Sequence, residues 1–311
     1  MVRPRWPERA LGAAAALMID QVAGEPAVPE RWHPVALFGT GVGALERRLY
    51  DDRVGPGVVL AGAGVGVAGL AGVALRSPVA AAYLACAGRG LHDAAEAVGH
   101  ALGEGDVGRA RELLPALVGR DPAGLDGPAI ARAVVESVAE NTTDAIVAPA
   151  LWTLAAGAAG AFVHRAGDTL DSMVGYRDGT YRRFGTAAAR IDDVLAWVPA
   201  RVTAGLVALA RPSRAGDVVR AVRREAPAHP SPNAGVAEAA FAAALGLQLG
   251  GGENRYGDRV ECRPLLGRGR DPEAADIAKA VDLSRDLTWL LAAMLGAAGL
   301  AGRSRRARRR R

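Results

Sequence analysis

The most conspicuous pattern along the chain is a series of long apolar runs without charged residues. The run Val54–Leu75 lies between Arg53 and Arg76 and contains 22 residues. A helix of that length extends about 33 Å, at roughly 1.5 Å per residue, which is enough to cross a hydrocarbon core of about 30 Å. We therefore predict a transmembrane helix over these residues.

Other apolar runs extend this pattern to much of the chain. They are residues 77–88, 145–163, 194–210 and 287–302. The first of them follows a predicted break at Arg76-Ser77-Pro78, where the chain could turn back. A soluble Ala/Gly-rich helical core is the alternative, but buried helices rarely contain so many uncharged residues in a row.

The run at residues 145–163 leaves two arrangements open. If it crosses the membrane as one helix, the polar residues before and after it lie on opposite faces. Pro149, Gly157 and Gly160 within the run also allow a broken helix that returns to the same face, because irregular backbone is tolerated where protein buries it. The second arrangement suits an active site better and is the one we favour.

The polar segments between the runs have the periodicity of amphipathic helices. Residues 89–102 and 107–118 predict a helical hairpin, residues 217–225 and 274–291 predict further helices, and residues 229–233 and 250–269 predict loops. No strand pattern competes with the helical one. We predict an all-α, polytopic integral membrane protein with helical cytoplasmic segments, formed by one membrane-embedded domain over residues 1–302 and a basic cytoplasmic tail over residues 303–311.

Composition and charge support a membrane protein rather than a nucleic-acid binder. The chain has 311 residues, half of them hydrophobic and only 5% aromatic, with 38 Lys and Arg against 33 Asp and Glu. Seven of the arginines lie in residues 303–311, so the remainder is slightly acidic and lacks the basic face that a nucleic-acid binder needs. By the positive-inside bias, this tail should face the cytoplasm.

The N-terminus and the cysteines point to an uncleaved chain in a reducing compartment. Arg3, Arg5 and Arg9 before the apolar residues 10–19 imitate a signal peptide, but no clear cleavage site follows. We interpret this segment as membrane-associated and retained. Cys86 and Cys262 are far apart and belong to no zinc-site or disulfide pattern.

Two familiar motifs have simpler explanations in this sequence. A G-x-G-x-x-G pattern begins at Gly64, but it lies inside the 22-residue apolar run, where Gly62 and Gly66 rather indicate a face for close helix packing. His92, Glu96 and His100 share one helical stripe and could ligate a metal. A solvated polar face is the more common explanation of such a stripe.

Dense polar clusters next to the apolar runs are the best candidates for a functional site. One contains Glu136 and Glu140, which are four residues apart and would project from the same face of a helix. Such like charges repel unless a cation joins them, and acidic groups at a membrane boundary are costly unless they bind metal, pair with arginine or line a wet cavity. A solvated loop is the alternative explanation, because Asp and Asn are also common cap and turn residues.

These clusters, in their order along the chain, resemble the CobD/CbiB family of cobalamin biosynthesis, the adenosylcobinamide-phosphate synthases. The matching stretches are Asp20…Gly24-Glu25-Pro26…His33-Pro34-Val35, Val118-Gly119-Arg120-Asp121, Glu136-Ser137-Val138-Ala139-Glu140-Asn141-Thr142, Thr169-Leu170-Asp171-Ser172-Met173-Val174-Gly175-Tyr176, Asp192-Asp193-Val194…Pro199-Ala200-Arg201 and Ser231-Pro232-Asn233-Ala234-Gly235. The sequence departs from the family pattern at Pro122, Asp168 and Arg177, where Thr, Asn and Lys are usual. The resemblance covers most of residues 17–270.

The resemblance implies a multi-pass protein of the cell (inner) membrane, with its active site facing the cytoplasm. The implied reaction is the ATP-dependent amide ligation of adenosylcobyric acid with (R)-1-amino-2-propanol O-phosphate, or a related amino-alcohol phosphate, to give adenosylcobinamide phosphate. ATP and Mg²⁺ are the implied cofactors. The corrinoid and the amino-alcohol phosphate are the implied substrates, with other enzymes of the pathway as candidate partners.

Site residues follow from that chemistry, which needs carboxylates for Mg²⁺, cations for phosphate and a base for the amine. The candidate metal ligands are Glu136, Glu140, Asp144, Asp171, Asp192 and Asp193. The candidate catalytic residues are His33, Glu136, Glu140, Asp171 and Arg177. The candidate substrate- and phosphate-binding residues are Arg120, Asn141, Ser172, Tyr176, Arg201 and Asn233, and Arg177 is a further phosphate-clamp candidate. A membrane transporter or a non-catalytic scaffold of the same pathway remains the alternative function.

Overall fold

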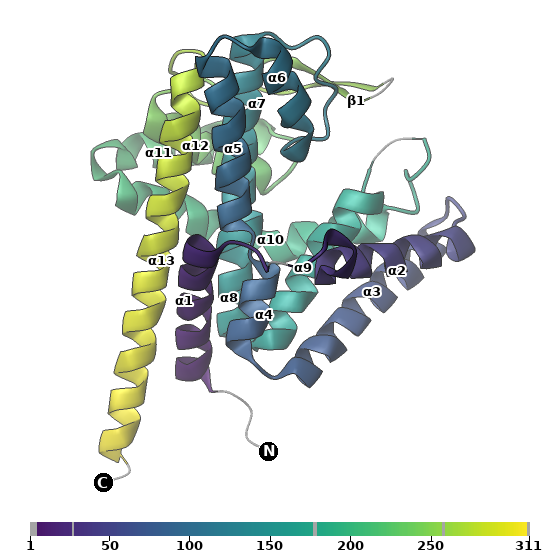
Figure 1. The fold of residues 1–311 in the computed structure, drawn as a ribbon, viewed down its shortest axis with the longest axis vertical. Coiled ribbons are helices and arrows are strands. Elements are labelled where there is room, and N and C mark those ends of the chain that lie inside the picture. Colours follow the sequence, from purple (N-terminus) through teal and green to yellow (C-terminus); the bar gives the residue numbers. More distant parts are fainter. Residues whose placement is uncertain (1–4, 27, 177–178, 257–258, 310–311) are drawn as a thin grey trace. The chain divides into compact units, whose positions relative to one another are not determined.

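The fold is described from a computed structural model that covers residues 5–26, 28–176, 179–256 and 259–309. The chain divides into two compact units, where the sequence analysis treated residues 1–302 as one domain. Unit 1 comprises Met1–Ala87, Asp144–Val198 and Leu291–Arg311, and unit 2 comprises Gly88–Thr143 and Pro199–Leu290. Figure 1 shows that helices predominate throughout, which confirms the predicted all-α class.

Unit 1 is entirely helical over its described elements. They are α1 (Trp6–Ala23), the short 3-10 turn Glu30–Trp32, α2 (Pro34–Leu49), α3 (Val54–Leu75), α4 (Pro78–Ala85), α8 (Ala148–Ala156) and α9 (Ala158–Val174), joined by parts of α10 (Thr186–Ala210) and α13 (Ala274–Arg309). A π-helical turn, Thr143–Val147, precedes α8. The helix α3 has the predicted bounds, and the predicted break after it is present, with Arg76 in the left-handed conformation at φ 58°.

Helix α3 packs against α9 through a stripe of glycines. A Cβ atom at Gly72 would lie 2.6 Å from the carbonyl oxygen of Ala158, and one at Gly64 would lie 3.0 Å from the side chain of Leu170. Gly62 and Gly66, which the sequence suggested for close packing, have open space around them. The prediction of a close-packing glycine face is therefore right in kind but wrong in its residues, because the helix presents a different stripe to its neighbour.

The apolar run at residues 145–163 is broken into two helices. Helix α8 ends at Ala156 and is capped by Gly157, whose φ of +69° favours glycine, and α9 begins directly after it. The two helices pack against each other, and a Cβ atom at Gly160 would lie 2.2 Å from the carbonyl oxygen of Trp152. The run is thus broken rather than one straight helix, and the return of its two ends to one face of the membrane stays a prediction.

Three helices within the described residues are long and apolar enough to cross a membrane. They are Val54–Leu75, Thr186–Ala210 and Ala274–Arg308. The second and third contain the predicted runs 194–210 and 287–302. Only 22% of the most apolar window of Val54–Leu75 is buried inside the protein, as expected for a helix whose other faces contact lipid.

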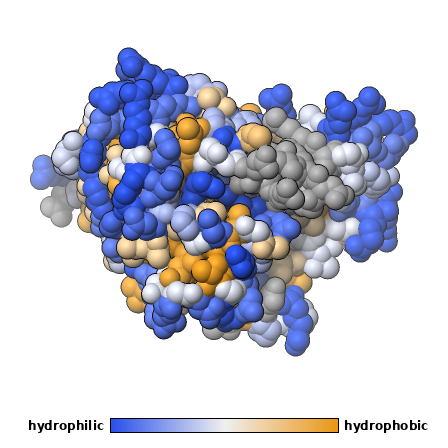
Figure 2. All heavy atoms as spheres, turned by 90° about the horizontal axis from the view of Figure 1, so that it is seen from above, coloured by the Kyte–Doolittle hydropathy of each residue, from blue (hydrophilic) through white to orange (hydrophobic). Residues whose placement is uncertain are grey.

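Unit 2 combines helices with one small β-hairpin. Its elements are α5 (Gly88–Gly103), α6 (Val107–Leu113), α7 (Gly127–Thr142), α11 (Ala215–Arg224) and α12 (Ala234–Leu245), the remaining parts of α10 and α13, the 3-10 turns Leu114–Ala116, Pro212–Arg214 and Ala226–Ala228, and strands β1 (Glu253–Tyr256) and β2 (Arg259–Cys262). Helices α5 and α6 pack together as the predicted helical hairpin. Much of the surface in Figure 2 is hydrophilic, with an apolar area among the polar side chains.

The β-hairpin corrects the prediction that residues 250–269 form only a loop. Strands β1 and β2 pair antiparallel over four residues each, from Glu253 opposite Cys262 to Tyr256 opposite Arg259. Strands this short offer too few alternating positions to stand out among Gly, Pro and Asn. The correction matters for function because residues on both sides of the hairpin reach the site described below.

The stripe of His92, Glu96 and His100 on α5 is not a metal site. The buried His92 ring pairs with the hydroxyl of Ser284 at 2.9 Å, and Glu96 pairs with Arg285 at 2.7 Å. His100 lies 3.4 Å from Glu104 at the surface. Each residue of the stripe therefore pairs with a different side chain rather than with a shared ion. The explanation as a solvated polar face holds for Glu96 and His100 but not for His92, which is buried.

Candidate functional site

The predicted pair Glu136 and Glu140 borders a pocket of about 130 Å³ in unit 2. Helix α7 carries both residues. Asp126 caps its N-terminus, because the side chain of Asp126 accepts a hydrogen bond from the backbone N–H of Ala129. Four residues apart on a helix, the two carboxylates share a face, as predicted. The pocket is lined by Leu117, Val118, Gly119, Arg120, Glu136, Ser137, Glu140, Glu238 and Arg263.

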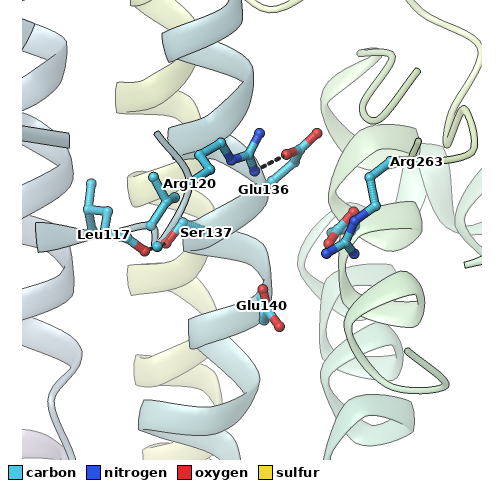
Figure 3. Close-up of a pocket in the computed structure, with 9 residues that line it drawn as sticks. Leu117, Arg120, Glu136, Ser137, Glu140 and Arg263 are labelled. Atoms are coloured by element: carbon cyan, nitrogen blue, oxygen red, sulfur yellow. Dashed lines mark hydrogen bonds and ion pairs between the residues drawn. The ribbon is translucent and has the colours of Figure 1, made fainter. Parts of the chain in front are cut away.

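Arg120 and Glu136 form a buried ion pair at the wall of this pocket. An Nη atom of Arg120 donates to Oε2 of Glu136 at 2.6 Å, and their side chains are only 9% and 6% exposed. The other carboxylate oxygen of Glu136 accepts from the backbone N–H of Gly250 at 2.8 Å. Figure 3 shows Arg120 reaching Glu136 from the loop before α7, with Glu140 one turn further along the helix. Glu136 thus uses both oxygens to hold neighbouring parts of the chain.

Two further contacts fix the loop segments around this pair. The hydroxyl of Ser137 donates to the carbonyl oxygen of Leu117 at 2.8 Å, which fastens the segment that carries Arg120 to α7. Gly250 has a φ of +70°, and a Cβ atom there would lie 2.0 Å from the carbonyl oxygen of Pro264. Glycine is therefore required where the backbone turns to donate to Glu136.

Glu238 adds a third carboxylate to the pocket, from α12. It is 5% exposed and is the single charged residue of an otherwise apolar helix. Burial raises the pKa of Glu238 well above its ordinary value, and the nearby carboxylates of Glu136 and Glu140 raise it further. Arg263 and Arg120 act in the opposite direction but do not cancel the rise. Glu238 therefore retains its proton to higher pH than an exposed glutamate does.

His229 connects Glu238 to Arg263. Its Nε2 atom lies 2.6 Å from an Nη atom of Arg263 and 3.7 Å from Oε1 of Glu238. A guanidinium group has no acceptor, so at 2.6 Å it donates, and Nε2 must carry the lone pair. The ring proton is then on Nδ1, which lies 3.1 Å from both the carbonyl oxygen and the backbone nitrogen of Ser231. A protonated Nδ1 donates to the carbonyl oxygen and cannot accept from the nitrogen. We assign His229 to the neutral Nδ1–H tautomer on this basis.

The predicted motif Ser231–Gly235 has a structural explanation around this histidine. A Cβ atom at Gly235 would lie 2.4 Å from the Cβ atom of His229, so only glycine allows His229 to pack against the start of α12. The hydroxyl of Ser231 accepts hydrogen bonds from the backbone N–H groups of Asn233 and Ala234. The side chain of Asn233 in turn accepts from Arg201 at 2.8 Å. Two predicted binding residues, Arg201 and Asn233, are thus brought together.

The other predicted residue of unit 2 has a local role in the structure. The side-chain amide of Asn141 donates to the carbonyl oxygen of Ser137 at 2.9 Å, one turn back along α7. Unlike Ser137, Asn141 is not among the residues that line the pocket.

The remaining predicted residues belong to unit 1. His33 immediately precedes α2 and lies 3.9 Å from Glu25, Asp144 lies in the π-helical turn before α8, and Asp171 and Ser172 lie in the last turn of α9. Tyr176 is exposed beyond the end of α9, and Asp192 and Asp193 are partly buried on α10. Arg177 lies outside the described residues. The structure therefore groups Arg120, Glu136 and Glu140 in one pocket, and it leaves the role of the unit 1 residues as a prediction.

Sequence reasoning missed Glu238, His229 and Arg263. A usable signal existed for Glu238, because one acidic residue in a helix of Ala, Val, Phe and Leu is costly unless it has partners. His229 precedes a matched motif by two residues. Arg263 gave no signal, since it follows a hairpin that the sequence did not reveal.

Comparisons with known proteins agree with the resemblance. A family model described as CobD/Cbib protein matches residues 13–284. A Mycobacterium tuberculosis (strain ATCC 25618 / H37Rv) protein, named Cobalamin biosynthesis protein CobD, is 47% identical over 298 residues, which covers 92% of this chain and 94% of the relative. Proteins of the same name from Chromobacterium violaceum and Rhodobacter capsulatus are 43% and 41% identical, over 94% and 87% of this chain and 97% and 91% of their own lengths. No solved structure matches the chain.

Proposed function

The chain belongs to the CobD/CbiB family of cobalamin biosynthesis proteins, and from that premise we propose that it is an adenosylcobinamide-phosphate synthase. The proposed reaction joins a carboxyl group of adenosylcobyric acid to the amine of (R)-1-amino-2-propanol O-phosphate, or a related amino-alcohol phosphate, with consumption of ATP. The observation that carries the proposal is the pocket in unit 2, in which a buried arginine–glutamate pair adjoins two further carboxylates and a second arginine.

The residues of this pocket fit a bound nucleotide with Mg²⁺ in part. ATP with Mg²⁺ would supply the activation of a carboxyl group whose oxygen must leave when the amide forms. Glu140 is an exposed carboxylate on the pocket wall and could contact the ion, whereas both oxygens of Glu136 already accept hydrogen bonds. Within the part of the chain that the structure describes, no three His, Cys, Asp or Glu side chains form a metal-binding group. This favours an ion held mainly by phosphates and water, as is usual for Mg²⁺.

Glu238 is suited to handle the proton of the incoming amine. An amine attacks a carboxyl carbon only in its neutral form, so the ammonium group must first lose a proton. A carboxylate whose pKa is raised is a stronger base than an ordinary glutamate, so it is better suited to accept that proton. His229 remains neutral beside it, because its Nε2 lone pair is directed at Arg263. In this proposal Glu238 moves the proton, and Arg120 and Arg263 bind anionic groups.

The test is an assay of the purified full chain in detergent with adenosylcobyric acid, the amino-alcohol phosphate, ATP and Mg²⁺. We expect adenosylcobinamide phosphate to form only when ATP and both substrates are present. Omission of ATP and the Glu140→Gln variant are the matched controls. Absence of product with all components present, in a preparation shown to be folded, would contradict the proposal and favour a transporter or a scaffold.

A further inference from the structure

Unit 2 contains a second pocket, of about 410 Å³. His229 lines the second pocket and also lies 3.7 Å from Glu238, which lines the first. The charged side chains that line the second pocket are Arg201 and Arg223, and among the described residues no carboxylate lines it. We call it the proline pocket, because Pro227, Pro230 and Pro232 form part of its wall.

Arg201 occupies an unusual position for a charged side chain. It is the one charged residue in the apolar run of residues 194–210, on a helix long and apolar enough to cross a membrane. A charge in such a helix is costly unless it has a polar partner or a ligand. The side chain of Arg201 donates to Asn233, and it also lines the proline pocket. Its guanidinium group is therefore held in place at the wall of a cavity.

The walls of the proline pocket are well fixed before any ligand binds. The prolines restrict the backbone of residues 226–232, and the hydroxyl of Ser231 caps the start of α12. Asn233, which orients Arg201, donates its backbone N–H to the same hydroxyl. Preorganised walls reduce the ordering cost of binding a small ligand.

The charges of the two pockets favour different ligands. The two arginines of the first pocket lie beside the carboxyl groups of Glu136, Glu140 and Glu238, so the pocket has no excess of positive charge for a free anion. The proline pocket presents guanidinium groups without a carboxylate, and guanidinium groups bind phosphate oxygens in a bidentate manner. A volume of about 410 Å³ accommodates a small phosphate ester.

We propose that the proline pocket binds the phosphate group of a small phosphomonoester that carries an amine, with its amine directed toward the wall formed by His229 and Glu238. This inference rests on the proposed function in one respect, since the ester is then the amine substrate of the ligation. The phosphate group stays in the cationic pocket while the amine reaches the pocket where the carboxyl group is activated. Arg201 and Arg223 are binding residues for the phosphate.

The direct test measures binding of O-phosphoethanolamine to the full chain in detergent by isothermal titration calorimetry. Arg223→Gln removes one guanidinium group from the pocket. Arg224→Gln is its matched control, because Arg224 is the next residue on α11, is also exposed and does not line the pocket. We expect Arg223→Gln to weaken binding by about tenfold or more, as for the loss of a hydrogen bond to a charged group. We expect Arg224→Gln to bind within about twofold of the wild type. Equal affinity of the two variants, or no binding by the wild type, would overturn the proposal.

A second measurement separates this inference from the proposed function. In the ligase assay, we expect Arg223→Gln to raise KM for the amino-alcohol phosphate, to leave kcat nearly unchanged and to leave KM for the phosphate-free amino alcohol unaffected. If the ligase assay yields no product but O-phosphoethanolamine binds in an Arg223-dependent manner, the phosphate site is supported and the proposed reaction is contradicted. If product forms with the same KM for the amino-alcohol phosphate in the wild type and in Arg223→Gln, the reaction is supported and the phosphate site is contradicted.

Discussion

Replacing Glu136 should destabilise the protein, whereas the same replacement at Glu140 should not. Glu136→Gln keeps the shape of the side chain but removes the charge that pairs with Arg120 at 2.6 Å, in a wall where both side chains are less than 10% exposed. Removing one partner of a buried ion pair costs roughly 3–5 kcal/mol, because the other charge stays buried. Glu140 is exposed, so its replacement by Gln involves no such cost.

The expected size of the effect is easily measured. At roughly 2–4 °C per kcal/mol, Glu136→Gln should lower the Tm by about 6–20 °C. Thermal unfolding of the purified full chain in detergent, followed by far-UV circular dichroism, gives this value, and Glu140→Gln is the matched control. Ligase activity measured well below both Tm values then separates the two roles. Glu140→Gln should lose turnover while remaining as stable as the wild type.

A double variant tests the cause of the instability. Replacing both members of a buried pair with apolar residues of similar volume is often neutral. Arg120→Met combined with Glu136→Leu should therefore recover part of the Tm that Glu136→Gln loses, although the backbone N–H of Gly250 loses its acceptor. A Tm for Glu136→Gln within about 2 °C of the wild type would refute the reasoning, because no buried charge would then have lost a required partner.

Three further predictions follow from the structure. Because the raised pKa of Glu238 means that the folded state binds more protons, stability should fall as pH rises above the ordinary carboxyl range, and Glu238→Gln should flatten this fall of Tm with pH. Gly160→Ala should lower the Tm, because its Cβ atom would lie 2.2 Å from a carbonyl oxygen of α8, whereas Gly62→Ala, with open space around it, should not. Cysteines placed at Asp282 and at Ser304, in a background without Cys86 and Cys262, should react with an impermeant thiol reagent from opposite faces of the membrane. Labelling of both from one face would show that α13 does not cross.

The sequence located the helices well where charge marks their ends. Arg53 and Arg76 flank an uncharged run, and the helix observed there has the same bounds as the run. The break at residues 145–163 was predictable only as one of two arrangements. Pro149 lies in the first turn of α8, where it is tolerated, and only Gly157 adopts the positive φ that ends the helix.

The candidate site was predictable only as far as local spacing reaches. Glu136 and Glu140 share a helix, so their spacing alone places them on one face. The partners of Glu136 lie 16 and 114 residues away, at Arg120 and Gly250, and no periodicity connects residues so far apart. For the same reason the sequence did not reveal that the carboxylate of Glu136 pairs with Arg120, and its role as a metal ligand stays a prediction.

The orientation of α13 in the membrane bears directly on the proposed reaction. Asp286 on this helix pairs with Arg211 at 2.8 Å, and Ser284 accepts a hydrogen bond from Thr142 at the end of α7. The helix that carries the first pocket is thus tied to the segment of α13 that precedes its apolar run at residues 287–302. If that run crosses the membrane, this segment and the basic tail emerge on opposite faces.

A cytoplasmic ligase site and a cytoplasmic tail then require opposite orientations of α13. ATP is cytosolic, so the proposed reaction requires the Asp282 end of α13 to lie in the cytoplasm, whereas the positive-inside bias places the arginines at residues 303–309 there. A straight helix that crosses once can satisfy only one of these demands. Suppose that Ser304→Cys is labelled from the cytoplasmic face and Asp282→Cys from outside. The pocket would then lie on the face without ATP, and this result would favour the transporter or the scaffold. The reverse pattern would support the ligase and would mean that packing of the folded chain overrides the charge bias of the tail.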